Sequence, residues 1–127
     1  MNEEENLKKV IESMTNITFA MMILNDRKDK HGVCKCMDAC YNLRNIARDL
    51  IEWEEIKYTA IPYYADEVIA SLKGIDFSGA NALCSDGTHK DCGLLNAADG
   101  VMSAIASMVS LKNQIESIME RFDTVLV

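Results

Sequence analysis

Apolar residues recur along this chain at alternating intervals of three and four, which is the spacing of one face of an α-helix. In residues 3–25 the apolar row is Leu7, Val10, Met14, Ile17, Met21 and Leu24. A second row runs through Leu94, Ala98, Val101, Ile105, Met108, Lys112, Ile115, Met119, Phe122 and Leu126. The pattern predicts a first helix over residues 3–25 and a last helix from Leu94 onward.

Two further helices are predicted between these. The row Cys36, Cys40, Leu43, Ala47, Leu50 and Trp53 predicts a second helix over residues 33–57, after a charged turn at residues 26–32. Pro62 lacks the amide hydrogen that a helix interior needs, but it fits the first turn of a new helix. We therefore expect a third helix that ends at a Gly74 cap. The alternative is that Pro62 bends a single long helix.

The expected architecture is all-α: one domain over residues 1–127, folded as a compact antiparallel four-helix bundle. The 127 residues are enough for one buried core. Short connections favour up-and-down order, and the long loop over residues 74–93 lies between helices three and four. In this topology the turn before the second helix and the loop before the last helix lie at the same end.

The five cysteines and two histidines lie in two short stretches, His31-x2-Cys34-x-Cys36-x3-Cys40 and Cys84-x4-His89-x2-Cys92. The topology brings both stretches to one end of the bundle. Zn2+ takes four sulfur and nitrogen ligands, so a zinc site is a candidate there. The candidate metal ligands are His31, Cys34, Cys36, Cys84, His89 and Cys92. We expect Cys40, on the apolar row, to be a small core residue.

Cys34 and Cys36 are two residues apart and would point to opposite sides of a helix, so both reach one metal only if Cys34 precedes the helix. Two alternatives stay open. Lysines such as Lys30, Lys35 and Lys90 would lower the pKa of nearby thiols and make them redox-sensitive. The cysteines could instead anchor the long loop by packing or by a disulfide.

The net charge of -7 and the pI near 4.7 argue against nucleic acid as a partner, because such binding needs clustered Lys and Arg. No unbroken apolar run approaches the ~18 residues of a membrane span, and the acidic start does not resemble a secretory signal. These features predict a cytoplasmic protein that binds no membrane.

Acidic residues are predicted to gather at the end opposite the cysteines. They are Glu3, Glu4, Glu5, Glu52, Glu54, Glu55, Asp66, Glu67, Glu116, Glu120 and Asp123. An acidic end attracts a basic protein partner, as in inhibitor-like proteins. It also permits a Mg-dependent helical nucleotide hydrolase that uses Glu52 and Glu55, although the second carboxylate pair of such enzymes is missing.

The favoured hypothesis is a small non-enzymatic binding or regulatory protein with a cysteine and histidine site at one end of the bundle. Residues 17–24 are apolar around most of the first helix, and the first half of the last helix is rich in Ala, Ser and Gly. These segments offer more apolar surface than one bundle needs, which predicts a homo-oligomer.

Overall fold

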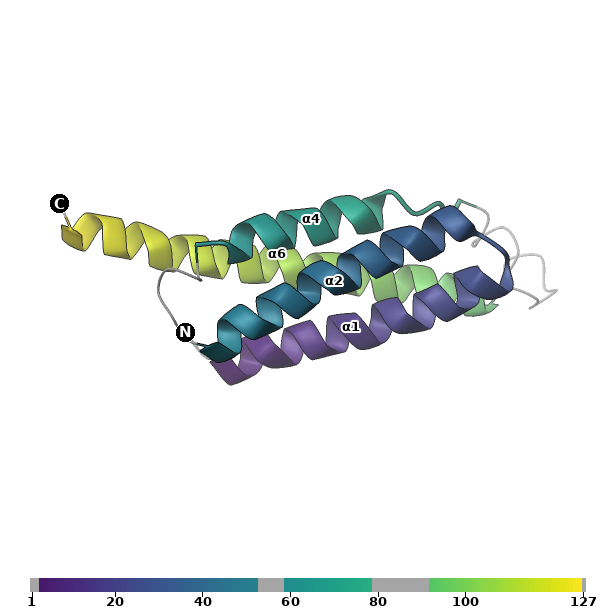
Figure 1. The fold of residues 1–127 in the computed structure, drawn as a ribbon, viewed down its shortest axis with the longest axis horizontal. Coiled ribbons are helices and arrows are strands. Elements are labelled where there is room, and N and C mark those ends of the chain that lie inside the picture. Colours follow the sequence, from purple (N-terminus) through teal and green to yellow (C-terminus); the bar gives the residue numbers. More distant parts are fainter. Residues whose placement is uncertain (1–2, 53–58, 79–91, 127) are drawn as a thin grey trace.

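The computed structural model describes residues 3–52, 59–78 and 92–126, and within them the chain forms four α-helices. These are α1 (Glu3–Asp26), α2 (Lys30–Glu52), α4 (Ile61–Lys73) and α6 (Cys92–Leu126). Helices α1 and α4 each pack against both α2 and α6, so the four helices form a closed ring around one core (Figure 1). The predicted all-α bundle with a long connection between its third and fourth helices is confirmed.

The connection between α2 and α4 follows the sequence prediction where the structure describes it. Pro62 lies in the first turn of α4, and the helix ends at Gly74, whose amide donates a hydrogen bond to the Ser71 carbonyl at 3.2 Å. Gly74 keeps helical angles, with φ -79°, so its cap does not depend on the left-handed conformation. Pro62 therefore starts a separate third helix.

The innermost rows of α1 and α6 match the predicted rows at alternate positions and differ by one residue at the positions between them. In α1 the most buried residues are Asn6, Val10, Ser13, Ile17, Ala20 and Leu24, while Met14 and Met21 flank this row. In α6 they are Leu94, Ala97, Val101, Ala104, Met108, Leu111 and Ile115. In α1 the predicted row had the larger Leu7, Met14 and Met21 at the positions between. Small side chains take the centre because they let four helices approach closely, and larger ones fill the flanks.

Two polar side chains lie in the core of α1. The side-chain nitrogen and oxygen of Asn6 and the hydroxyl of Ser13 are buried and have no hydrogen-bond partner in the part of the chain that the structure describes. Leaving a buried polar group unsatisfied costs about 1 to 3 kcal/mol. Asn6 and Ser13 therefore make the first half of α1 contribute less to the stability of the fold than apolar residues at these positions would.

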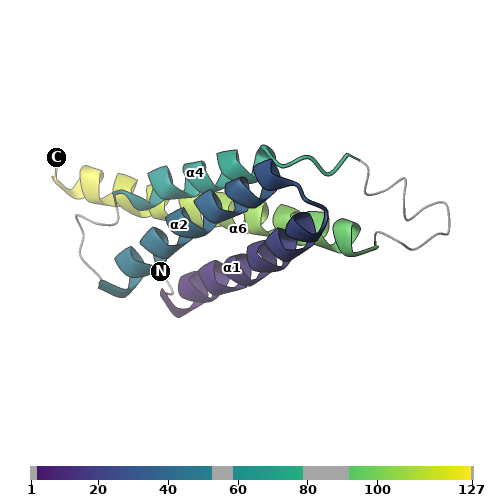
Figure 2. The ribbon, with the colours of Figure 1, turned by 45° about the vertical axis from the view of Figure 1, so that its right-hand side comes forward.

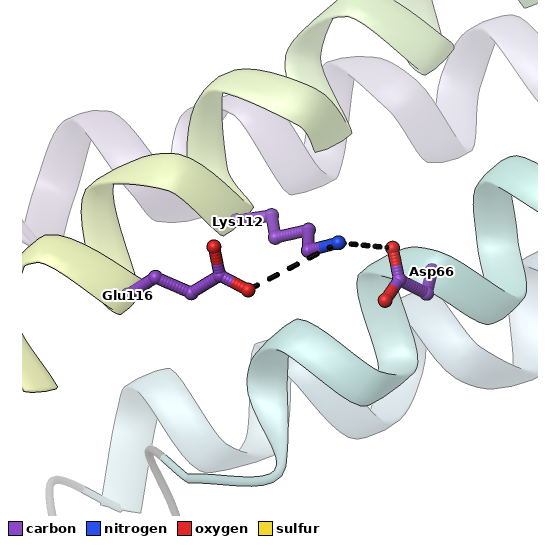
Figure 3. Close-up of polar contacts among 3 residues, drawn as sticks. All are labelled: Asp66, Lys112 and Glu116. Atoms are coloured by element: carbon purple, nitrogen blue, oxygen red, sulfur yellow. Dashed lines mark hydrogen bonds and ion pairs between the residues drawn. The ribbon is translucent and has the colours of Figure 1, made fainter.

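Lys112 is the one charged residue on the predicted row of α6, and it links α6 to α4. Its Nζ lies 2.8 Å from Asp66 Oδ1 and 4.0 Å from Glu116 Oε1 (Figure 3). The hydrogen bond to Asp66 raises the pKa of Lys112, with added support from the charges of Asp66 and Glu116. Lys112 thus sits at the edge of the core as an ion-pair partner.

Helix α6 is the longest of the described helices and is rich in apolar residues. Its segment Gly93–Glu120 is long and apolar enough to cross a membrane by length and composition, although polar residues interrupt its apolar runs. The core helix of a soluble bundle meets the same criterion, and seven residues of α6 form part of the core.

Replacing Ser13 by Ala should stabilise the fold, because it removes a buried hydroxyl without a partner. Ser to Ala also raises helix propensity, so the matched control is Ser117→Ala at an exposed position of α6. We expect Ser13→Ala to add about 1 kcal/mol more to the free energy of unfolding than Ser117→Ala. Urea denaturation measures both. Equal effects would show that the Ser13 hydroxyl finds a partner in solution.

Candidate functional site

The turn between α1 and α2 fixes where the first cysteine stretch begins. The amide of Asp29 donates to the Leu24 carbonyl at 2.9 Å, and the amide of Lys28 donates to the Asn25 carbonyl at 3.0 Å. This is the Schellman pattern that ends a helix with one left-handed residue. That residue is Lys28, with φ 61°, where glycine is usual. The chain therefore reverses direction between α1 and α2 within three residues.

Asp29 then starts α2 directly. Its Oδ1 accepts a hydrogen bond from the Gly32 amide at 2.9 Å, the geometry of an N-cap. A Cβ at Gly32 would lie 2.6 Å from Asp29 Oδ2 and 3.0 Å from Leu24 Cδ1, so a side chain there would disturb the cap. Asp29 and Gly32 together let α2 start one residue after the cap.

Helix α2 therefore begins at Lys30 and not at residue 33 as predicted. The condition under which Cys34 and Cys36 could reach one metal, that Cys34 precedes the helix, is not met. Both lie inside α2, with Cys34 exposed and Cys36 fully buried. The short turn explains the difference, because the sequence pattern assigned seven residues to a reversal that needs only three.

The thiols of the first stretch sit in three environments. Burial raises the pKa of Cys36 to about 12, and the neighbouring Cys40 and Asp29 add to the shift. Burial also raises the pKa of Cys40, which a hydrogen bond with the Thr18 side chain partly offsets. Cys40 packs against the core from its edge, between α2 and α1. Cys34 and His31 are exposed, so they are the accessible candidates of this stretch.

The second stretch lies mostly outside the described residues, which include neither Cys84 nor His89. The backbone of Cys92 begins α6. Next to it, a Cβ at Gly93 would lie 3.2 Å from Ile23 Cδ1, so α6 starts beside the last turns of α1. The α1–α2 turn and the start of α6 therefore lie at the same end of the bundle (Figure 1).

Over residues 3–52, 59–78 and 92–126 there is no group of three or more Cys, His, Asp and Glu side chains that could hold a metal. A zinc site that includes Cys84, His89 and Cys92 stays a prediction, because Cys84 and His89 are not described. From the first stretch, only His31 and Cys34 are exposed enough to join it without a change in α2.

The sequence reasoning missed a shallow hollow between α2 and α4, with a volume of about 370 Å³. Its lining residues are Lys35, Asp38, Tyr41, Asn42, Glu67, Ala70 and Ser71. The stem of Lys35 runs along the end of α4, where its Cε would be 3.3 Å from a Cβ at Gly74. The hollow presents charges of both signs. Its lining residues recur at spacings of three and four in α2 and α4, and this pattern is the sequence signal that could have predicted a shared side.

The expected acidic end is partly described. The start of α1, the end of α2, the start of α4 and the second half of α6 lie opposite the α1–α2 turn (Figure 1). Glu4, Glu5 and Glu52 are exposed there, whereas Glu67 lines the hollow between α2 and α4 and Asp66 pairs with Lys112. Glu54 and Glu55 are not among the described residues, so the carboxylate pair of the hydrolase hypothesis cannot be assembled from the described side chains.

Comparison of the chain with protein-family models, with curated proteins and with solved structures found no match. The four helices and their contacts define the class of protein as an antiparallel four-helix bundle.

Lys28→Gly should stabilise the protein, because glycine adopts the left-handed conformation of this position without steric cost. We expect a gain of about 1 kcal/mol in the free energy of unfolding. The matched control is Lys8→Gly at an exposed position in the second turn of α1, which should lose about 1 kcal/mol. Thermal denaturation of both variants tests the turn. A loss for Lys28→Gly would mean that the turn differs from the Schellman geometry.

The cysteines of α2 should differ in reactivity with a disulfide reagent at neutral pH. Cys34 should react readily, whereas Cys36 should react at least about tenfold more slowly, because it is buried and its thiolate is rare at a pKa of about 12. Mass spectrometry of peptides after brief labelling measures both rates. Comparable labelling of the two would place Cys36 outside the core.

The same burial has a consequence for stability at high pH. The unfolded thiol of Cys36 ionises near its ordinary value of 9.0, while the folded thiol keeps its proton until about pH 12. Within that window the unfolded state binds fewer protons, so the free energy of unfolding falls as the pH rises. Cys36→Ala should show a shallower fall between pH 9 and 11 in urea titrations, whatever its stability at pH 7.

Proposed function

We propose that this chain is a small, cytoplasmic, non-enzymatic binding or regulatory protein whose cysteine and histidine end is its regulatory site. The observation that carries the proposal is the convergence of the two cysteine-bearing segments. The first turns of α2 and the first residue of α6 lie at one end of the bundle, although about fifty residues separate them in sequence.

The chemistry of Cys34 supports this role. Its thiol is exposed within the first two turns of α2. Lys30 and Lys35 lie within one turn of it and add positive charge. A thiol in this setting is suited either to metal coordination or to a reversible disulfide with a cysteine of the second stretch.

The two forms of the site have different consequences. A zinc ion would connect the first turn of α2 to residues of the second stretch without an oxidant. A disulfide would need a two-electron oxidant such as hydrogen peroxide, which takes two electrons and both protons from the two thiols and is reduced to two molecules of water. In either form, the loop before α6 becomes tied to the bundle. The binding of a partner that recognises the conformation of this end would therefore depend on metal supply or redox state.

Native mass spectrometry tests the proposal on the full chain, purified under reducing conditions and then treated either with zinc or with peroxide. We expect one bound zinc ion or one internal disulfide, seen as a loss of two mass units. Cys34→Ser and Cys92→Ser should each abolish the species or weaken it at least about tenfold.

Cys40→Ala is the matched control, because Cys40 lies on the same helix but packs against the core. It should retain the zinc or the disulfide. The proposal fails if the wild-type protein stays metal-free and reduced after both treatments. It also fails if Cys40→Ala loses the species as fully as Cys34→Ser does.

A further inference from the structure

Helix α2 has a second regular row of residues, on a side that faces away from the core. Its innermost row packs into the core at Cys36, Ala39, Leu43, Ile46 and Leu50. The second row, here called the outer row, follows the same alternating steps of three and four. Its members are all exposed, and they are Cys34, Met37, Tyr41, Arg44, Arg48 and Ile51. Residues at this spacing share one side of a helix, so α2 presents a continuous row to solvent.

The neighbouring helices leave the outer row uncovered. Helix α2 packs against α1 on one flank and α4 on the other, and both views show it running between them (Figures 1 and 2). Met37 is 58%, Tyr41 64% and Ile51 68% exposed. At 1.5 Å per residue the outer row is roughly 27 Å long. Three large apolar side chains along this length are therefore available to a partner.

The charge of α2 differs from that of the other described helices. Helix α2 has four basic and three acidic residues, whereas α1 has two and five, α4 one and two, and α6 two and four. It is thus the net basic helix among them, in a chain with a net charge of -7. The acidic residues of α2 lie off the outer row, with Asp38 in the hollow, Asp49 buried and Glu52 at the helix end.

The two arginines of the outer row are suited to bind carboxylates. Arg48 Nε donates to Oδ1 of the buried Asp49 at 3.4 Å, which leaves both terminal amino groups of the guanidinium for a second partner. Arg44 lies one helical turn before Arg48, and it forms no ion pair with the residues that the structure describes. Like charges at this spacing destabilise a helix. A carboxylate from a partner would relieve that repulsion and accept two parallel hydrogen bonds from one arginine.

The residue types and the spacing of the outer row indicate the kind of partner. Met, Tyr and Arg are enriched at protein interfaces, and Tyr and Arg are frequent among the residues that contribute most to binding. Four of the six residues in the row belong to these types. Alternating steps of three and four also form the seam along which two helices pack. A helix that carries carboxylates matches both features.

We propose that the outer row of α2 is a docking site for an acidic, amphipathic helix of a partner protein. Apolar side chains of that helix pack against Met37, Tyr41 and Ile51, and its carboxylates pair with Arg44 and Arg48. Two-fold pairing of α2 with its own copy would bring four arginines together with no carboxylate of the row to neutralise them. Membranes and nucleic acids are anionic over large areas, and the net charge of -7 opposes their approach.

Cys34, the accessible thiol of the proposed regulatory site, is the first residue of the outer row and lies one turn before Met37. Docking does not depend on its chemistry, because the rest of the row is exposed while the thiol is free. A zinc ion or a disulfide at Cys34 would cover the start of the row. Either form would therefore compete with the docked helix.

A fluorescently labelled peptide tests the docking site on the full chain, which is kept reduced. The peptide has about 21 residues, or three heptads, with leucine in one row at steps of three and four and glutamate beside it. We expect saturable binding by fluorescence anisotropy that weakens when salt rises from 0.05 to 0.5 M, because salt screens the pairs between arginine and carboxylate. A peptide with lysine in place of glutamate, and one with the same residues scrambled, should bind at least about tenfold more weakly.

Substitutions in the outer row are compared with matched changes elsewhere. Arg44→Glu and Arg48→Glu should each raise the dissociation constant of the acidic peptide at least about tenfold. Lys73→Glu makes the same change of charge at an exposed position of α4 and should leave the dissociation constant within about twofold. Met37→Ala should weaken binding at least about fivefold. Its control is Met102→Ala on α6, where Met102 is 63% exposed, and this variant should bind as the wild type does.

Circular dichroism confirms that each variant keeps its helices. The docking site is refuted if the acidic peptide does not bind at about 1 mM, or if Lys73→Glu weakens binding as much as Arg44→Glu does. It is also refuted if the wild type binds vesicles that contain phosphatidylserine but not the peptide, since the arginines would then recognise phosphate. Cys34→Ser should bind the peptide as the wild type does, so a failure of the proposed zinc or disulfide site is distinguishable from a failure of docking.

Discussion

The close approach of four helices is the constraint on which the rest of this structure depends. Each innermost row contains at least one small residue, such as Ala20 in α1, Ala39 in α2, Ala65 in α4 and Ala104 in α6. Small side chains at the centre bring the backbones together and leave the larger side chains to fill the flanks. The orientation of every helix about its own axis follows from this arrangement. That orientation in turn decides which residues face solvent.

The consequences are clearest for the cysteines. With Ala39 and Leu43 turned to the centre of the bundle, Cys36 is carried into the core and Cys40 to its edge. Cys34 lies two residues before Cys36 and so points outward. The compact turn at Asp29 contributes equally, since a later start of α2 would have left Cys34 in a loop. Packing and turn geometry thus select the accessible thiol of this stretch.

The sequence was sufficient for the fold class, the separate helix after Pro62 and the placement of the two helix connections at one end. These depend on periodicity and on proline chemistry, which are local. The innermost row of α1 was predicted correctly at Val10, Ile17 and Leu24 and wrongly at the positions between. Leu7, Met14 and Met21 match the helical period as well as Asn6, Ser13 and Ala20 do. Choosing between them requires knowledge of both neighbouring helices. The left-handed conformation of Lys28 could not be predicted either, because glycine is the residue that usually indicates it in a sequence.

The accessible thiol and the hollow belong to the same helix. The side between α2 and α4 bears the mixed charges of the hollow, including Lys35 and Glu67. Cys34 is exposed on α2 and directly precedes Lys35 in the chain. A partner that binds at the exposed thiol would therefore meet charges of both signs beside it, which favours a polar partner surface over an apolar one.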